Sequence, residues 1–308
     1  MKYAHKPLPA FSGMSRRRLL GSGLAALDAL ASKNPLHATE AVPQKPEVRL
    51  RFSSWLIGLQ GDLDQQLDFV EKAGFEAVEL RGGVANNRAR WARALNGRPL
   101  EVSGLDWGHF TDMVSDDAAK RQKSIDSLKY AIEAAHELKA QVLVCVPPRH
   151  TAGVKLPDPI ATRKILMETL TPLAGMAAEA GTSIGIEAVR RSSVNCLHTL
   201  VEVAGFIRES KCEGLSLVAD FCIMMEEETN QTGAVLSGGK YIKQVHLSSR
   251  KRTLPGEEKE DEAQFLEGFR GLKMIGYNGF CSFECGKANY QDGVLKSMAF
   301  LRDVWARA

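Results

Sequence analysis

The sequence predicts an α/β protein, a (β/α)8 barrel of the TIM type, which forms a single domain after an N-terminal export signal. From Val48 onward, short β-favouring apolar runs alternate with helical patterns, as expected for a parallel sheet with crossover helices. Eight such strand–helix pairs fit into about 260 residues, the size typical of these barrels. Four of the strands also end in a side chain that can bind a metal ion. A doubly wound sheet is the structural alternative and would also place these strand ends along one edge.

The N-terminal segment has the features of a twin-arginine export signal. Arg16 and Arg17 are followed by leucines and a weak apolar run of about 13 residues, shorter than the ~20 residues needed to span a bilayer. We therefore expect a signal peptide at 1–38, a linker at 39–47, the barrel at 48–308 and no stable membrane anchor. The predicted location is the periplasm. A disordered tail that happens to contain arginines is the alternative.

Composition describes a soluble globular protein and argues against a nucleic-acid partner. The chain is 44% hydrophobic and 25% charged, with a formal net charge of +3. Residues 1–38 hold six of the 40 basic residues and one of the 37 acidic residues, so the rest of the chain has a net charge of −2. A mildly acidic domain disfavours binding to a polyanion. The six cysteines form no C-x-x-C pair and are expected to be buried free thiols.

Each predicted strand is a short run of apolar and β-favouring residues, and most predicted helices end at a glycine or a polar turn. The strands are predicted at 50–55, 75–80, 100–107, 142–146, 183–188, 215–220, 242–246 and 280–284. The helices are predicted at 62–73, 86–96, 116–138, 158–180, 197–210, at an undefined place within 227–239, at 262–276, and from the last strand to the C-terminus.

The last four predicted strands end in Glu187, Asp220, His246 and Glu284, and we refer to these four residues as the quartet. Because the C-terminal ends of barrel strands converge on one rim, the four side chains are expected to meet. Three carboxylates and one imidazole suit a hard or borderline divalent ion such as Mn²⁺. One strand-end acid is more often a solvated loop residue. Four such residues on successive strands predict a metal site.

The quartet and its spacing of 33, 26 and 38 residues resemble the xylose-isomerase-like superfamily, in particular its ketose 3-epimerase and hydroxypyruvate isomerase branch. The resemblance covers roughly residues 48–306. Further positions resemble the branch in the flanks of these strands: Glu79, Leu197, Thr199, Arg252, Pro255 and Gly256.

The resemblance implies a metal-dependent sugar isomerase or epimerase that acts on a small, non-phosphorylated carbohydrate. Such an enzyme removes a proton next to a carbonyl, and a divalent ion stabilises the enediolate that results. Glu187 and Glu284 would be both metal ligands and the catalytic base and acid, while Asp220 and His246 would hold the ion. Mn²⁺ is expected first, with Zn²⁺, Mg²⁺ or Co²⁺ as alternatives. The resemblance allows a homo-oligomer.

Substrate recognition is the less complete part of the resemblance. Arg252 is expected to contact substrate oxygens, although a solvated charge is an equal alternative. His109 is a candidate substrate contact, although a lone loop histidine more often faces solvent. Ser193, Ile223 and Met225 stand where the epimerase branch has charged or polar groups that bind hydroxyls. We therefore expect a larger or less polar substrate than a free ketose.

Three alternatives for the function are open. A lyase or deglycosylase acting on keto-glycosides would use the same enolisation chemistry, with elimination in place of reprotonation. A DNA-repair endonuclease on this fold would need a second, histidine-rich metal set, which this sequence lacks. A catalytically silent carbohydrate-binding protein is disfavoured by the intact pair of glutamates.

Overall fold

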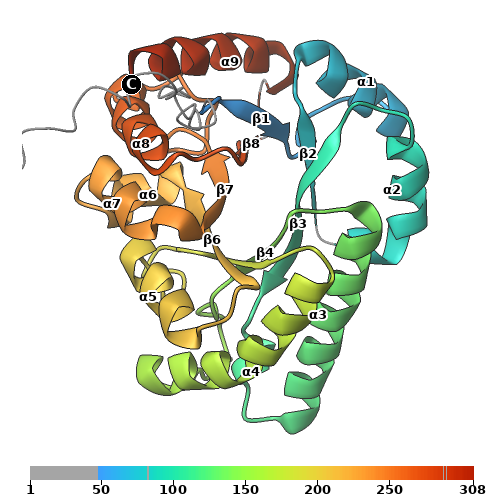
Figure 1. Cartoon of the computed structure of the whole chain (residues 1–308), viewed down its shortest axis with the longest axis vertical. Coiled ribbons are helices and arrows are strands. Elements are labelled where there is room, and N and C mark those ends of the chain that lie inside the picture. The colour runs from blue at the N-terminus through green and yellow to red at the C-terminus, as the bar shows by residue number, and fades with distance from the viewer. Residues whose placement is uncertain (1–47, 82, 287, 289) are drawn as a thin grey trace, which may run out of the picture. The chain divides into compact units, whose positions relative to one another are not determined.

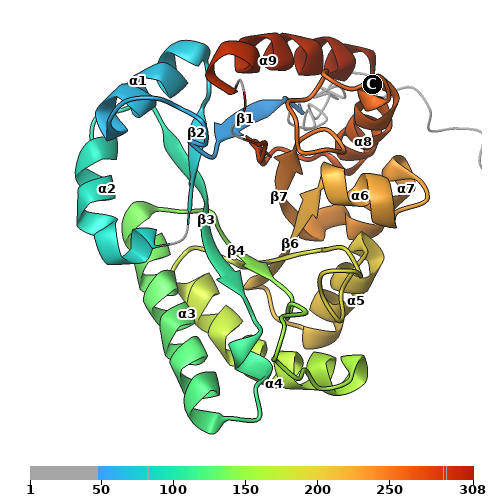
Figure 2. The ribbon, with the colours of Figure 1, turned by 180° about the vertical axis from the view of Figure 1, so that it is seen from behind.

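The protein forms a closed barrel of eight parallel strands in a computed structural model, which describes residues 48–308 except 82, 287 and 289. The helices surround the strands, as Figures 1 and 2 show from opposite sides. The predicted export signal and linker, residues 1–47, lie outside the described residues. Within the barrel, the predicted α/β architecture is confirmed.

The eight strands follow one another around the barrel in chain order, and β1 also pairs with β8 to close it. At this closure Arg51 lies opposite Phe280 and Ser54 opposite Phe283. The strands are β1 (Arg51–Ser54), β2 (Ala77–Leu80), β3 (Glu101–His109), β4 (Val142–Val146), β5 (Ile184–Glu187), β6 (Leu215–Asp220), β7 (Ile242–Leu247) and β8 (Phe280–Phe283).

The helices occupy the predicted intervals, with one exception after β6. They are α1 (Leu63–Ala73), α2 (Arg88–Leu95), α3 (Ala118–Leu138), α4 (Pro159–Glu179), α5 (Leu200–Ser210), α6 (Phe221–Glu227), α7 (Gln231–Gly238), α8 (Asp261–Ile275) and α9 (Tyr290–Arg307), with 3-10 turns η1 (Val84–Asn87), η2 (Asp112–Val114) and η3 (Gly239–Tyr241). The sequence predicted one helix within 227–239, whereas the structure has α6 directly after β6 and α7 after a break.

Side-chain caps determine where several helices begin. Asp62 and Gln65 form a capping box at the start of α1, and Thr199 and Glu202 form another at the start of α5. These side chains satisfy backbone N–H groups that have no partner inside the helix. Helix α5 was predicted from 197 but starts at Leu200, because Thr199 is its N-cap.

The interior of the barrel is partly polar, and the apolar core lies between the strands and the helices. Ser53 and Ser103 are hydrogen-bonded at 2.7 Å inside the barrel, whereas aromatic residues such as Phe52 and Phe283 pack edge to face at 5.4 Å. At Gly185 in β5, an added Cβ would lie 2.4 Å from a methyl carbon of Val142. The strand therefore needs a glycine there, because real Cβ atoms do not approach so closely.

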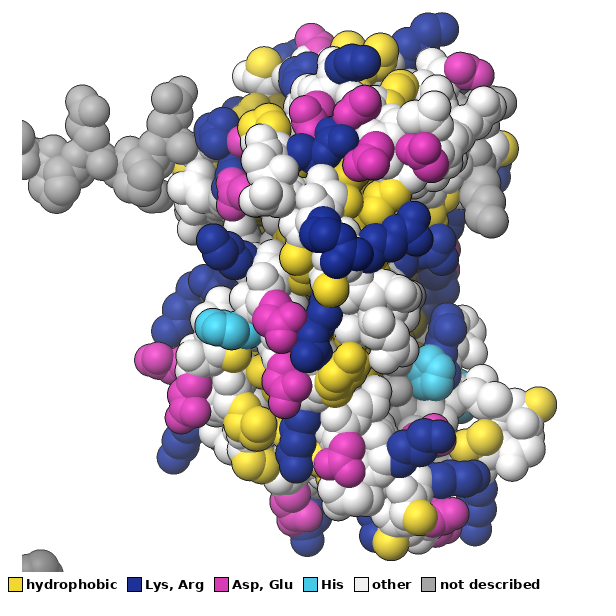
Figure 3. All heavy atoms as spheres, turned by 90° about the vertical axis from the view of Figure 1, so that its right-hand side faces the viewer, with side chains coloured by type: hydrophobic (Ala, Val, Ile, Leu, Met, Phe, Trp, Pro, Cys, Tyr) yellow, Lys and Arg dark blue, Asp and Glu magenta, His cyan; other side chains and the backbone are white. Residues whose placement is uncertain are grey.

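The surface and the thiols agree with the composition. On the face drawn in Figure 3, positive and negative side chains are interspersed. All six cysteines are free thiols, and five of them are buried. Among the described helices, none has both the length and the apolar character that crossing a membrane would require.

Candidate metal centre and active site

The structure brings the quartet together at the C-terminal rim of the barrel. Glu187 and Asp220 are the last residues of β5 and β6, His246 lies in β7, and Glu284 directly follows β8. Each residue offers one ligand atom, and these atoms all lie within 4.8 Å of one another. Glu187, Asp220 and His246 are buried, and Glu284 is partly exposed. Residues that are 97 positions apart in the chain therefore form one compact donor set.

The imidazole of His246 is fixed from both sides. Its Nδ1 lies 3.1 Å from Oε1 of Glu187 and 3.2 Å from Oε2 of Glu284. On the other side, its Nε2 lies 3.0 Å from Oε1 of Glu79, whose Oε2 accepts a hydrogen bond of 2.6 Å from Gln244. A carboxylate at Nε2 favours the tautomer with its proton there, which leaves Nδ1 free to bind a cation. Glu79 therefore directs His246 toward the other three residues of the quartet.

Burial and mutual charge shift the pKa values of these groups in different directions. Burial raises the pKa of Glu187 to about 7, helped by the negative charge of Glu284. Burial alone would lower the pKa of His246, but the charge of Glu79 and the bonds to Glu187 and Glu284 outweigh it and hold that pKa well above its ordinary value. For Glu284, burial is likewise outweighed, and its bond to His246 lowers its pKa. Two neighbouring glutamates thus have unequal basicity, as an acid–base pair requires.

The donor set fits a divalent cation. Among the described residues, the three carboxylates of the quartet and that of Glu79 form ion pairs with only two positive groups, His246 and Arg252. Buried carboxylates this close repel one another unless a cation compensates them. Oxygen ligands with one imidazole nitrogen suit Mn²⁺, Mg²⁺, Zn²⁺ or Co²⁺, and no thiolate belongs to the set. The residues that would hold the ion are the quartet.

Arg252 lies at the quartet and bridges two of its carboxylates. Its guanidinium is 2.5 Å from Oδ2 of Asp220 and 2.8 Å from Oε2 of Glu284. The backbone of Arg252 is left-handed, with φ of 60°, an uncommon conformation for a residue with a side chain. Hydrogen bonds hold it there, since its N–H donates to Ser249 and its carbonyl accepts from Gly286. Arg252 is therefore an ordered part of the site and not a freely solvated charge.

His109 is not brought to the quartet by any recorded contact. It is the last residue of β3 and is exposed. Partial burial, and then the positive charge of Arg149, lower its pKa. Within the part of the chain that the structure describes, no hydrogen bond or ion pair joins His109 to the quartet. Its role as a substrate contact stays a prediction.

Two residues near the quartet were not singled out by the sequence. The ring of Trp55 packs edge-on against that of His246, with 5.6 Å between centroids. Asp106 in β3 is largely buried, and burial, with the nearby charge of Glu79, raises its pKa to about 6. Both lie at or near the ends of predicted strands, as the quartet does. Their position at the strand ends could have identified them as candidates for the site.

An apolar cluster lies beside the quartet at the ends of β5 and β6. Ile223 is buried against Val189 and Val194, and Met225 is half-buried against the main core. Ser193 is also half-buried, and its carbonyl accepts a hydrogen bond from His150. Ile223 thus belongs to a small buried apolar cluster close to Asp220, while Met225 packs separately against the main core.

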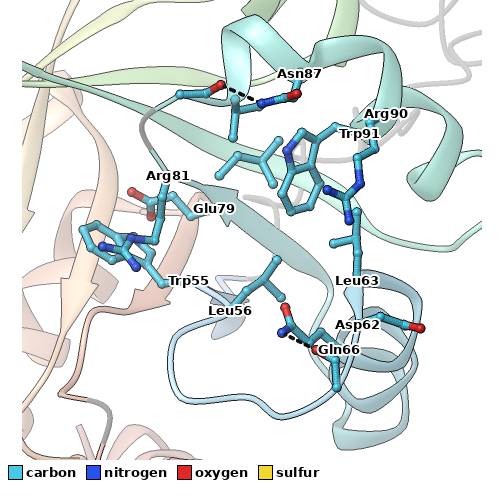
Figure 4. Close-up of a pocket in the computed structure, with 14 residues that line it drawn as sticks. Trp55, Leu56, Asp62, Leu63, Gln66, Glu79, Arg81, Asn87, Arg90 and Trp91 are labelled. Atoms are coloured by element: carbon cyan, nitrogen blue, oxygen red, sulfur yellow. Dashed lines mark hydrogen bonds between the residues drawn. The ribbon is translucent and has the colours of Figure 1, made fainter.

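A cavity of about 480 Å³ opens on the opposite part of the rim, over the ends of β1 and β2 (Figure 4). Trp55, Glu79 and Arg81 line one side of it, and Arg90 and Trp91 of α2 line another. It reaches the quartet through Glu79, which is bonded to His246.

Comparisons with known proteins agree with this geometry. Residues 67–304 match the family model described as xylose isomerase-like TIM barrel. The chain belongs to this family.

Relatives in the family carry epimerase names. The chain is 23% identical over 252 residues to 3-dehydro-D-guloside 4-epimerase of Escherichia coli K12, covering 77% of this chain and 93% of that protein. It is 29% identical over 198 residues to L-ribulose 3-epimerase of Methylomonas sp. DH-1, covering 63% and 68%. These relatives confirm the expectation that the chain is an enzyme of the isomerase and epimerase class.

Solved structures show the same fold. The apo crystal structure of a 3-keto-D-glucoside 4-epimerase from E. coli superposes with a TM-score of 0.72 at 20% identity, covering 83% of this chain and all of that one. D-Psicose 3-epimerase from Clostridium cellulolyticum H10, solved with D-tagatose, gives 0.72 at 17% identity, covering 82% and 95%.

Proposed function

We propose that this protein is a metal-dependent epimerase that moves a proton at a carbon next to a sugar carbonyl through an enediolate. The substrate is a non-phosphorylated carbohydrate, and a keto-glycoside is preferred over a free ketose. The observation that carries the proposal is the quartet, a buried set of three carboxylates and one imidazole whose ligand atoms lie within 4.8 Å of one another. The epimerase names of the relatives support it.

A divalent ion at the quartet would stabilise the negative charge that develops on the substrate oxygens. The proton itself is moved by the protein. One of Glu187 and Glu284 accepts the proton from carbon, and the other returns a proton to that carbon from the opposite side. Their surroundings differ, because burial raises the pKa of Glu187 while the bond to His246 lowers that of Glu284, and this difference supports unequal roles for the two carboxyls. Arg252 has a guanidinium between Asp220 and Glu284 and can donate hydrogen bonds to substrate oxygens.

The preference for a glycoside has two supports. Ile223 and Met225 are apolar residues packed into the interior, so neither can offer a charged partner to substrate hydroxyls. Each missing hydrogen bond of this kind weakens binding by roughly 1.5–3 kcal/mol. One relative is named for a guloside, which is a glycoside, although others are named for free ketoses. We propose Mn²⁺ as the preferred ion, and export to the periplasm by the twin-arginine route.

The test is to assay purified, Mn²⁺-loaded protein in deuterated water with two substrate sets. One set contains fructose, psicose and tagatose, and the other contains 3-keto-glycosides. We expect deuterium at the carbon next to the carbonyl and faster turnover of the second set. Glu187→Gln and Glu284→Gln keep the side-chain shape but remove the basic oxygen, so each should lower turnover by at least ~10²–10⁴-fold.

Three outcomes would contradict the proposal. Product without solvent label would indicate a hydride shift or hydrolysis. Release of an aglycone would favour the lyase alternative. Efficient epimerisation of a plain hexulose would remove the argued preference for glycosides.

A further inference from the structure

The cavity over β1 and β2 lies next to the quartet but is not part of it. Glu79 lines the cavity and bonds to His246, and Trp55 lines the cavity and packs against the same imidazole ring. None of the four quartet residues lines it. Its volume of about 480 Å³ is within the ~300–1,000 Å³ of small-molecule pockets. A single sugar ring bound at the quartet would therefore leave this space beside it.

Two tryptophans give the cavity flat apolar surfaces. Trp55 follows β1 and Trp91 lies in α2, and both line the cavity and are only partly buried. Figure 4 shows the two side chains on opposite sides of the cavity. Indole rings combine a large apolar face with a polar edge, and they bind partners that are apolar on one side and polar on the other. A pyranose ring, with C–H groups on its faces and hydroxyls around its edge, is such a partner.

The same cavity offers hydrogen-bond donors that the protein does not use elsewhere. Arg81 and Arg90 are exposed and line it, and neither forms an ion pair with any described residue. Arg81 lies over the ring of Trp55, with its guanidinium carbon 5.7 Å from the centroid. Each guanidinium carries five donors in a planar fork that matches neighbouring oxygens.

We infer that this cavity is a binding subsite for a second sugar ring, attached to the ring that reacts at the quartet. The inference rests on the proposed function and names its substrate class: a two-ring glycoside. The second ring stacks on Trp91, and its hydroxyl oxygens accept hydrogen bonds from Arg90 and Arg81. Turnover is confined to the first ring, so the second ring contributes binding only.

The experiment measures binding of stable probes by calorimetry to the full-length, Mn²⁺-loaded protein. The probes are methyl β-glucoside and a panel of glucose disaccharides of different linkage. We expect at least one disaccharide to bind about tenfold tighter than the methyl glucoside, which corresponds to about 1.4 kcal/mol. Arg90→Gln and Trp91→Ala should each remove most of that advantage and leave the affinity for the methyl glucoside unchanged.

Arg93→Gln is the matched control, because Arg93 is an exposed arginine of the same helix that does not line the cavity. It should bind every probe as the wild type does. The inference is overturned if no disaccharide binds tighter than the methyl glucoside, or if Arg93→Gln weakens disaccharide binding as much as Arg90→Gln does. Should Trp91→Ala fail to fold, Arg90→Gln decides alone.

The two proposals fail in different ways. If wild-type protein catalyses no proton exchange on any keto-sugar, the proposed function fails, whatever the probes do. If exchange occurs on a single-ring keto-sugar and Arg90→Gln does not change the preference for two-ring compounds, only the subsite is wrong.

Discussion

The orientation of His246 depends on a residue outside the donor set. Glu79 accepts from Nε2 of His246 at 3.0 Å and is itself fully buried. Partners of this kind fix the ring and raise its basicity, and their loss typically lowers metal affinity by about 10- to 100-fold. We expect Glu79→Gln to weaken Mn²⁺ binding by that factor, measured by competition with a chelating dye.

Ser103→Ala is the control for this prediction. Ser103 belongs to the same buried polar network, with its hydroxyl 3.4 Å from Gln244, but it has no hydrogen bond to His246. An unchanged affinity in Glu79→Gln would show that packing alone, including Trp55, orients the ring.

The elevated pKa of Glu187 makes metal binding dependent on pH. In the metal-free protein Glu187 carries a proton below about pH 7, and His246, whose pKa is also raised, carries one there too. A cation must displace these protons, so its affinity falls as the pH falls. Calorimetry at pH 6 and pH 8, in buffers of different ionisation enthalpy, should show weaker Mn²⁺ binding at pH 6 and proton release at both. Equal affinity at the two pH values would mean that Glu187 and His246 are already deprotonated at pH 6.

At the scale of elements, Leu197 and Thr199 have structural roles at the start of α5. Leu197 is buried with φ of 63°, and Thr199 caps α5 by accepting from the backbone N–H of Glu202. Losing such a cap lowers stability by about 0.5–2 kcal/mol. We expect Thr199→Ala to lower the free energy of unfolding by about 1 kcal/mol in denaturant titrations, without changing Mn²⁺ affinity. Thr199→Ser should behave as the wild type, and a loss of metal binding in Thr199→Ala would assign the residue to the site instead.

Most helices and strands could be predicted because the spacing of their apolar residues, and the glycines at which helices end, can be read from neighbouring residues in the sequence. The start of α6 directly after β6 could not, because it depends on Asp220. Its Oδ1 accepts from the N–H groups of Cys222 and Ile223, which starts α6 at once, while its Oδ2 faces Arg252. Asp220 ends a strand, caps a helix and points into the site. The sequence shows only one aspartate there, so these three roles could not be told apart.

The quartet could be predicted as a group because four strand ends share one rim. Contacts between distant segments could not. Glu79 and His246 are 167 positions apart, and their hydrogen bond follows only from the closed barrel. The place of Arg252 depends on a left-handed backbone in a loop, and the cavity lined by Trp55 and Trp91 depends on how two loops fold over their strands.

At the scale of the whole molecule, the N-terminal arginines predict that the protein is exported. Arg16 and Arg17 precede a weak apolar run, the arrangement that the twin-arginine pathway recognises. Replacing both by lysine keeps the charge but removes the motif, so we expect uncleaved protein in the cytoplasm, detected by fractionation and mass spectrometry. Lys2→Arg with Lys6→Arg is a control that should not change export. Normal export of the double-lysine variant would show that the segment is not a signal of this class.

The pairing of β1 with β8 determines when, during synthesis, the metal site can form. The barrel cannot close until residues 280–283 have left the ribosome, and Glu284 follows immediately after them. A nascent chain therefore holds no complete donor set until residue 284 has emerged. If the chain leaves the cytoplasm folded, as twin-arginine passengers do, it binds its ion from the cytoplasmic metal pool. The periplasmic metal supply then does not determine which metal the mature enzyme carries.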